Sequence, residues 1–488
     1  MKPSPLFKLA PFSSLTCAAA LLASLTACHK ETNQALRVAV IGEGELDANP
    51  VAADMLEAAG QEGLVALDEQ GRVVPALADR WIVTDDGLSY IFRLRDSAAP
   101  DGSPLTSESV RNALRQTIAA TKDTPLGLEL GVVDEVRAMA GRVVEIRLTH
   151  PMPDFLQLMA EPALGLRWRG RGTGPMRIKS KDGLLWLTAL PPSERGQPMP
   201  ENWQATTRPV TLVQKPVEAA LADLGAGRVD LVLGGSFADA ARIPNGRLSR
   251  LQAGFDPVAG LFGLKVENEQ GFLALPLNRE ALAMVIDRVA LGQALGIAGF
   301  VPNTRLLPMA LRGDDKSERW SDYDMEGRQK LAMQRISRWN AVHPERVRLR
   351  LALPKGPGAD ILATRITQDF GSIGVEIERV NIKDPADLRL LDQVAPYANP
   401  AWYFHVLHCR ANQDCSTESD ILIEKTSETS ASETIALYAE AERLTLSANV
   451  FIPLGLPVRW SASAGSVHGF SFNTHSLHNI YPMSQLGN

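Results

Sequence analysis

The chain has 488 residues, of which 45% are hydrophobic and 22% charged, as is typical of a folded globular protein. With 50 basic and 56 acidic residues the formal charge is −6. There is no surplus of cations to neutralise phosphates, so we expect no nucleic-acid partner. The only strongly apolar stretch lies at the N-terminus, which excludes a protein with many membrane spans.

Residues 1–27 predict a secretory signal peptide. Two early lysines precede an apolar core of about 13 residues, which is too short to span a bilayer comfortably. The core ends in Leu-Thr-Ala-Cys at 25–28, which resembles a bacterial lipobox and makes Cys28 the expected lipidation site. A plain signal peptide cut near Ala27 and an uncleaved anchor remain alternatives.

The polar stretch 28–35 is then a lipid-anchored tether, and the mature protein is expected in the periplasm or at the cell surface. That compartment is oxidising. Two cysteines follow the tether, Cys409 and Cys415, and their spacing of six predicts a local disulfide bond.

Residues 64–160 predict a small α+β unit. Apolar strands at 90–94 and 143–148 flank one amphipathic helix, whose inward face begins at Val110 and whose N-cap is Thr106. This pattern differs from the rest of the chain, which indicates a separate subdomain.

Two strand–helix–strand patterns follow, at 210–233 and at 347–380. Such units require parallel pairing of the two strands, and their separation in the sequence indicates two α/β lobes. Further helices are predicted at 279–295, with Val289 facing inward, and at 433–446.

Short motifs along nearly the whole mature chain resemble, in the same order, those of the family 5 extracellular solute-binding proteins. These are the oligopeptide- and dipeptide-binding proteins of ABC importers. The motifs lie at 63–71, 74–81, 85–95, 101–110, 172–176, 286–288 and 467–473. Each is weak alone, and their common order carries the resemblance.

The resemblance implies a type II periplasmic-binding-protein fold: two α/β lobes joined by a hinge, with an α+β subdomain inserted in the first lobe. The expected division is 36–62, 168–262 and 457–488 for the first lobe, 63–167 for the inserted subdomain, and 263–456 for the second lobe. The chain is expected to cross the hinge near 262–266 and near 452–458.

The resemblance also implies where a ligand binds. In the family a Trp-x-x-Asp stretch supplies a carboxylate for the α-ammonium of a peptide, and the matching stretch here carries Trp402, Tyr403 and, at the Asp position, His405. A neutral imidazole is a weaker partner for an ammonium than a carboxylate. Capture of a free peptide N-terminus is therefore in doubt, with Asp414 or Asp420 as possible substitutes.

Trp402 and Tyr403 are candidate ligand contacts, whereas core packing is favoured for Phe404. Glu45 and Leu46, with Glu43, follow the first strand, where the family's first lobe meets its ligand. His405, His408 and Cys409 have spacing compatible with a metal site, but no complete ligand set is evident and no metal or cofactor is expected.

No catalytic residues are expected either. The chain has no Gly-x-Ser-x-Gly motif, and no Lys-Ser or Lys-Thr follows the glycines at 170–174 to form a phosphate loop. The resemblance predicts a monomeric, non-catalytic lipoprotein that delivers a peptide-like solute to an ABC permease and its ATPase. The alternatives are the same fold binding an opine, a sugar or a metal chelate, and a sensor or scaffold lipoprotein without transport.

Overall fold

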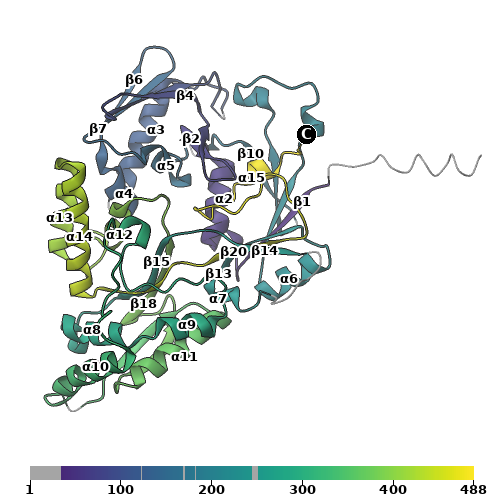
Figure 1. Cartoon of the computed structure of the whole chain (residues 1–488). Coiled ribbons are helices and arrows are strands. Elements are labelled where there is room, and N and C mark those ends of the chain that lie inside the picture. The colour runs from purple at the N-terminus through teal and green to yellow at the C-terminus, as the bar shows by residue number, and fades with distance from the viewer. Residues whose placement is uncertain are drawn as a thin grey trace, which may run out of the picture.

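The computed structural model describes residues 34–99, 101–122, 124–168, 171–181, 183–243, 251–343 and 345–487. The predicted signal peptide, the lipidation site Cys28 and most of the predicted tether lie outside these ranges. Three sheets of four or more strands organise the described chain (Figure 1).

The largest sheet has seven strands in the order β10-β11-β12-β1-β13-β20-β14. Both β12 and β13 run parallel to β1, which lies between them. The first predicted strand–helix–strand unit therefore forms as expected, with α6 as its helix. We call this sheet and its helices the first lobe; its strands are β1 (Leu36–Ile41), β10 (Met176–Lys181), β11 (Leu184–Ala189), β12 (Val210–Lys215), β13 (Leu231–Ser236), β14 (Gln252–Phe255) and β20 (Arg459–Ser463).

The second lobe is built on a five-stranded sheet in the order β17-β16-β18-β15-β19. Its β16 and β17 are parallel neighbours, which is the pairing that the second strand–helix–strand pattern predicts. The strands are β15 (Gly260–Val266), β16 (Arg348–Leu353), β17 (Glu376–Asn381), β18 (Leu388–Val394) and β19 (Phe451–Gly455).

A four-stranded antiparallel sheet, β4-β5-β7-β6, forms the inserted subdomain between β1 and β10. Its helix α3 (Ser107–Ala120) starts at a capping box in which Thr106 and Ser109 exchange hydrogen bonds, as the sequence indicated for Thr106. The strands are β4 (Ala78–Val83), β5 (Ser89–Leu94), β6 (Val133–Met139) and β7 (Val143–Leu148).

The remaining helices cover these sheets or connect them. They are α2 (Pro50–Gly60), α4 (Pro125–Glu129), α5 (Phe155–Met159), α6 (Val217–Gly225), α7 (Phe237–Ala240), α8 (Pro276–Val285), α9 (Arg288–Leu295), α10 (Met325–Asn340), α11 (Pro357–Gly371), α12 (Pro400–Leu407), α13 (Thr417–Lys425), α14 (Ala431–Ala448) and α15 (Ile480–Met483). Two-stranded ribbons pair β2 (Val65–Leu67) with β3 (Val73–Pro75), and β8 (Arg167–Trp168) with β9 (Arg171–Gly172).

The chain passes between the two lobes twice, at residues 256–259 and 456–458, which we call the crossing segments. The first lies earlier than the expected 262–266, which is part of strand β15. Beside them Arg459 of β20 donates to both carboxylate oxygens of Asp392 in β18, at 2.9 and 3.0 Å. This ion pair joins the two sheets directly.

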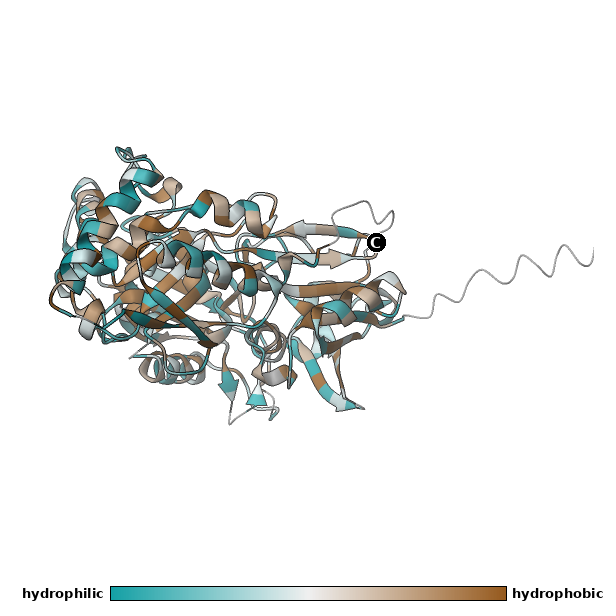
Figure 2. Ribbon diagram, turned by 90° about the horizontal axis from the view of Figure 1, so that it is seen from below, coloured by the Kyte–Doolittle hydropathy of each residue, from teal (hydrophilic) through white to brown (hydrophobic). Residues whose placement is uncertain are grey.

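Apolar packing also continues from one lobe to the other. One core cluster contains side chains from both sheets, and Phe237 of α7 meets Phe262 of β15 edge to face at 4.9 Å between ring centroids. A Cβ on Gly358 at the start of α11 would lie 2.1 Å from the carbonyl oxygen of Phe237. The glycine therefore permits the close approach of α7 and α11. Figure 2 shows the hydrophobic residues concentrated in the interior strands.

The prediction of a single helix over 279–295 is wrong. The structure has two helices, α8 and α9, and Asp287 between them caps α9 by accepting the N–H of Ala290 at 2.9 Å. Because the helix breaks, the face of α9 is not continuous with that of α8. Val289, which was expected to face inward, is 60% exposed.

Arg288 holds this break in place. Its buried guanidinium donates to the carbonyl oxygens of Pro453 in β19 at 2.8 Å, and of Ala283 and Ile286 at 3.1 Å each. The side chain thus ties both helices to the sheet and satisfies carbonyls that the helix break leaves free. No helix of the described chain combines the length and apolar character needed to cross a membrane.

We expect Arg288→Ala to lower the free energy of unfolding by about 3 kcal/mol, because three carbonyls lose their partner. Arg338→Ala, at an exposed position near the end of α10, is the control and should change it by no more than about 0.5 kcal/mol. Urea unfolding followed by circular dichroism measures both. Equal effects of the two substitutions would contradict the structural role of Arg288.

Candidate functional site

A cavity of about 410 Å³ lies where the two crossing segments meet loops of the second lobe and the C-terminal segment. Most of its wall is apolar and is contributed by prolines, alanines, Val301, Met309 and Leu456. The full wall comprises Pro257, Ala259, residues 301–303 and 308–312, Glu318, residues 395–398, Tyr403, Leu456, Thr474 and His475. Its volume lies within the range typical of sites for small organic ligands.

The charged groups of this wall are paired with each other. Arg312 donates to Glu318 at 2.8 Å and to the carbonyl oxygen of Ser317 at 2.9 Å. Glu318 also accepts from the backbone N–H of Thr304 at 3.0 Å and from its hydroxyl at 2.5 Å. Burial alone would raise the pKa of Glu318, but the hydrogen bonds from Thr304 and Arg312 outweigh it and the pKa is lowered. Glu318 is therefore a carboxylate with its charge compensated.

His475 and Tyr403 are among the other polar residues of the cavity wall. Burial lowers the pKa of His475, so its imidazole is neutral at pH 7. Tyr403 is fully buried, and its hydroxyl has no hydrogen-bond partner among the described residues. A buried hydroxyl without a partner destabilises the protein. A hydrogen bond from this hydroxyl to a ligand would therefore contribute more binding free energy than a hydrogen bond at an exposed position.

A second cavity, of about 870 Å³, separates the inserted subdomain from helices α12 to α14. Glu129, at the end of α4, bridges the two sides. Its buried carboxylate accepts the hydroxyl of Tyr397 and pairs with Nδ1 of His405 on α12. His405, which stands at the position of the family's ammonium-binding Asp and was predicted as a ligand contact, joins the second lobe to the inserted subdomain. In Figure 1, α4 and α12 lie next to each other.

Carboxylates cluster on the subdomain side of Glu129. Burial, together with Asp54 and Glu129, raises the pKa of Glu161 to about 8. Burial also raises the pKa of Asp54, to about 6, and that of Asp154, with the neighbouring carboxylates Glu57 and Glu129 adding to the effect. Glu161 is thus protonated at pH 7, which reduces the mutual repulsion of the group.

The other residues expected to bind a ligand lie away from the 410 Å³ cavity. Trp402 and Phe404 are 7% and 2% exposed and pack in a core cluster of the second lobe. Glu45 is exposed and Leu46 packs against the core of the first lobe, outside the walls of both cavities. Of the predicted ligand contacts, the structure brings only Tyr403 to the smaller cavity and His405 to the larger one.

The sequence gives no sign that the loop segments 301–312 and 395–398 form much of the wall of the 410 Å³ cavity. They contain proline, alanine and asparagine without helical or strand periodicity, so the sequence marks them only as connections. Glu129 was missed because its partner His405 lies 276 residues away.

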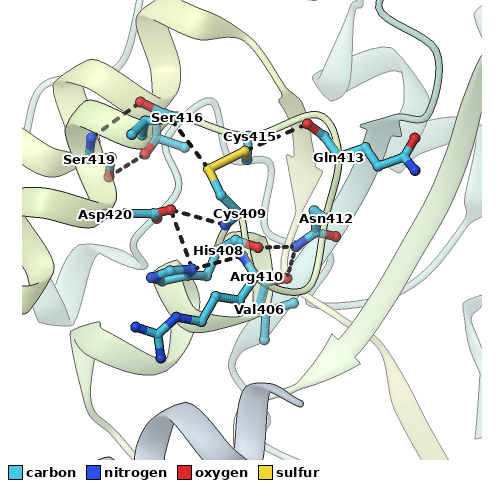
Figure 3. The surroundings of a disulfide bond; sticks show 12 residues. Val406, His408, Cys409, Arg410, Asn412, Gln413, Cys415, Ser416, Ser419 and Asp420 are labelled. Carbon is cyan, nitrogen blue, oxygen red and sulfur yellow. Dashed lines mark hydrogen bonds and ion pairs between the residues drawn. A yellow bond between two sulfur atoms is a disulfide. The ribbon is translucent and has the colours of Figure 1, made fainter. Parts of the chain in front are cut away.

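Cys409 and Cys415 form a disulfide bond that closes the loop after α12, with their Cα atoms 5.2 Å apart (Figure 3). The Cys409 N–H donates to Asp420 at 3.0 Å, and the Arg410 N–H donates to Nδ1 of His408 at 3.1 Å. The Asn412 side chain donates to the carbonyl oxygens of Val406 and His408, at 2.9 Å each. The loop is thus fixed by its own contacts.

Two alternatives were raised for this segment: a ligand carboxylate from Asp414 or Asp420, and a metal site that includes Cys409. Asp420 is buried beneath the loop, and neither it nor Asp414 belongs to the walls of the two cavities. Cys409 is not free to bind a metal because it is in the disulfide. Across the described ranges, no three His, Cys, Asp or Glu side chains gather in a geometry that could hold a metal ion.

Replacing both cysteines, Cys409→Ser with Cys415→Ser, should lower the free energy of unfolding by about 2 kcal/mol, as expected for opening a short disulfide loop. Urea unfolding with and without dithiothreitol measures the effect. The reductant should bring the wild type to the level of the double variant and leave the variant unchanged. A wild type insensitive to dithiothreitol, and equal to the variant, would contradict the bond.

The raised pKa of Glu161 predicts a dependence of stability on pH. A carboxyl whose pKa is higher in the folded than in the unfolded state stabilises the fold while it is protonated, and this contribution is lost as the pH rises through about 8. We expect the free energy of unfolding of the wild type to decrease between about pH 5 and about pH 9. In Glu161→Gln this decrease should be smaller by on the order of 3 kcal/mol, because glutamine does not titrate.

Denaturant unfolding at a series of pH values tests this, with Glu201→Gln, at an exposed position, as the matched control. The control should follow the wild-type profile. Parallel profiles for the wild type and Glu161→Gln would show that Glu161 is not held protonated.

Residues 72–193 match the family model of bacterial extracellular solute-binding proteins, family 5, middle region. Among curated proteins, the chain is similar to the probable deoxycholate-binding periplasmic protein YgiS of Escherichia coli K12, with 32% identity over 121 residues. That match covers 21% of this chain and 23% of the relative. The glutathione-binding protein GsiB of Escherichia coli is 24% identical over 335 residues, which cover 65% of this chain and 64% of the relative. The matched parts thus span less than two thirds of these relatives.

Solved structures share the fold over nearly the whole chain. Haemophilus influenzae OppA in complex with the peptide RPPGFSPFR has a TM-score of 0.78 at 16% identity, covering 92% of this chain and 98% of that one. The Escherichia coli murein tripeptide binding protein MppA has a TM-score of 0.77 at 17% identity, covering 93% and 99%. Campylobacter jejuni NikZ with Ni(L-His) has a TM-score of 0.74 at 17% identity, covering 92% and 99%.

These structures confirm the expected type II periplasmic-binding-protein fold. The match to the family model lies in the inserted subdomain and the strands that follow it, where several of the quoted motifs lie. The chain therefore matches the family 5 model over residues 72–193, and over nearly its whole length it shares the fold of these solved solute-binding proteins.

Proposed function

We propose that this protein is the non-catalytic, extracytoplasmic receptor of an ABC importer, and that it binds a small peptide-like or other organic solute between its lobes. The observation that carries the proposal is the 410 Å³ cavity, whose wall combines both crossing segments, second-lobe loops and the C-terminal segment. A solute in this position contacts both crossing segments, the second-lobe loops and the C-terminal segment at once.

Such a solute would favour the closed arrangement of the lobes. A ligand shifts a conformational equilibrium only by the difference between its contacts in the two states. Contacts to Pro257 and Leu456 on the crossing segments, and to His475 from the C-terminal segment, are the kind that opening would break. The closed and liganded form would then be the one that the permease recognises.

The names of the relatives support a solute receptor but differ in the solute. OppA is bound to a peptide, MppA is named for a murein tripeptide, GsiB for glutathione and YgiS for deoxycholate. For this chain we propose a solute whose binding does not require a carboxylate at position 405, because His405 is paired with Glu129.

The lipobox-like sequence ending in Cys28 supports anchoring to a membrane through lipid, with the permease and ATPase as separate chains. The negative formal charge and the absence of a basic surplus are consistent with a solute receptor that binds no nucleic acid.

Filling the cavity tests the proposal. Ala398 is exposed in the cavity wall, so Ala398→Trp should occupy the space and abolish solute binding while the fold is kept. Ala222→Trp, at an exposed position on α6, is the matched control and should bind as the wild type does. Native mass spectrometry of protein purified from its membrane, followed by identification of the released molecule, measures occupancy.

The proposal predicts one solute on the wild type and on Ala222→Trp, and none on Ala398→Trp. A wild type that carries no solute, and gives no heat in calorimetric titrations with peptides, sugars, bile acids and amino-acid conjugates, would contradict it and favour a sensor or scaffold role.

A further inference from the structure

We infer that the solute held in the 410 Å³ cavity is an uncharged, largely apolar molecule carrying a hydrogen-bonding group, and that zwitterionic amino acids and peptides are excluded. This inference rests on the proposed function and specifies the chemical class of its solute. The supporting observation is that the charged side chains in and around the cavity wall are already paired within the protein.

Every charged side chain of the wall is already compensated. Arg312 and Glu318 pair with each other at 2.8 Å, and their remaining bonds go to Ser317 and Thr304. Neither is available as the counter-ion of a ligand unless this pair first breaks. Breaking it would leave one charge buried and unpaired, which is costly.

Two carboxylates that adjoin residues of this wall are engaged as well. Glu129 binds Tyr397 and His405. Asp256, next to the first crossing segment's Pro257, is buried and accepts hydrogen bonds from the backbone N–H of Asn473 at 2.9 Å and from the hydroxyl of Ser476 at 3.1 Å. Neither side chain belongs to the cavity wall, so neither offers an anchor for a ligand ammonium.

An ammonium or carboxylate buried in this cavity would therefore lose its hydration without gaining an ionic partner, and such a transfer is strongly unfavourable. An uncharged ligand avoids this cost. Its apolar surface can instead contact the side chains of Val301, Met309, Leu311 and Leu456, and the burial of apolar surface supplies the binding free energy.

Two atoms of wall residues are buried without a hydrogen-bond partner among the described residues: the hydroxyl of Tyr403 and Nε of Arg312. Of these two, the Tyr403 hydroxyl is the uncharged one, and it is free to donate a hydrogen bond. Asn303 is buried in the same wall, and its side-chain oxygen accepts the N–H of Arg305 at 3.0 Å, so its own carbonyl is already used. A neutral carbonyl or hydroxyl on the solute is the group that Tyr403 would recognise.

A matched pair of ligands tests the inference on the mature full chain. N-phenyl-1-naphthylamine, an uncharged fluorophore, reports occupancy, and N-acetyl-leucyl-leucine methylamide and free leucyl-leucine are the competitors. These two compounds share their apolar side chains and differ in their terminal charges. We expect the blocked compound to displace the fluorophore at a concentration at least about 100-fold lower than the free dipeptide.

Two substitutions link the result to this cavity. Ala398→Asp adds a carboxylate to the wall and should weaken the blocked compound at least about tenfold, whereas Ala222→Asp on the exposed face of α6 should leave it unchanged. Tyr403→Phe keeps the ring and removes the hydroxyl, and should weaken the blocked compound by about threefold to tenfold without affecting the fluorophore.

The outcomes separate this inference from the proposed function. Equal or tighter binding of free leucyl-leucine, or a charged molecule found in the cavity by native mass spectrometry, would overturn the inference and leave the receptor role intact. If neither competitor binds, a neutral molecule that co-purifies with the wild type but not with Ala398→Trp supports the inference. The absence of any bound molecule would overturn the proposed function and the inference with it.

Discussion

The ion pair between Arg459 and Asp392 joins the two large sheets at the place where the chain crosses between them. Both side chains are largely buried, at 15% and 16% exposure, and Arg459 also donates to the backbone carbonyl of Asp392 at 3.1 Å. A charged pair removed from water is stable only when its geometry is satisfied, so the pair restricts how β18 and β20 can lie relative to each other. The crossing segments, and with them the cavity between the lobes, depend on that arrangement.

Apolar contacts act in the same region. The core cluster that runs through both sheets, and the close approach of α7 to α11 at Gly358, mean that the lobes share packed surface beside the crossings as well as covalent links. Packed side chains resist continuous deformation, so movement of the lobes has to occur where packing is sparse. The cavities are such places, and the bridge from Glu129 to His405 and Tyr397 spans the larger of them.

Several charges in and near the two cavities are compensated within the protein. Arg312 compensates Glu318, His405 faces Glu129, and Glu161 carries a proton at neutral pH. Under the receptor function proposed above, selection of a solute would then depend on shape, apolar contact and the hydrogen bond that Tyr403 can offer. Such a receptor would share its fold with peptide-binding proteins and still differ from them in the ligands that it accepts, because specificity belongs to the site and not to the fold.

The sequence by itself determined the local elements and the fold class. Periodicity and caps predicted the strand–helix–strand units around α6 and α11 and the start of α3 at Thr106, and the order of motifs indicated the two-lobed fold. These signals are readable because they depend on neighbouring residues. The sequence did not reveal the break at Asp287, where a capping side chain overrides helical periodicity. It also gave Trp402, Tyr403 and His405 as ligand contacts; in the structure Trp402 packs in a core cluster, Tyr403 borders the smaller cavity and His405 pairs with Glu129. Only the tertiary structure decided which loops meet in the cavity and which charges are already paired, because both depend on contacts between residues hundreds of positions apart.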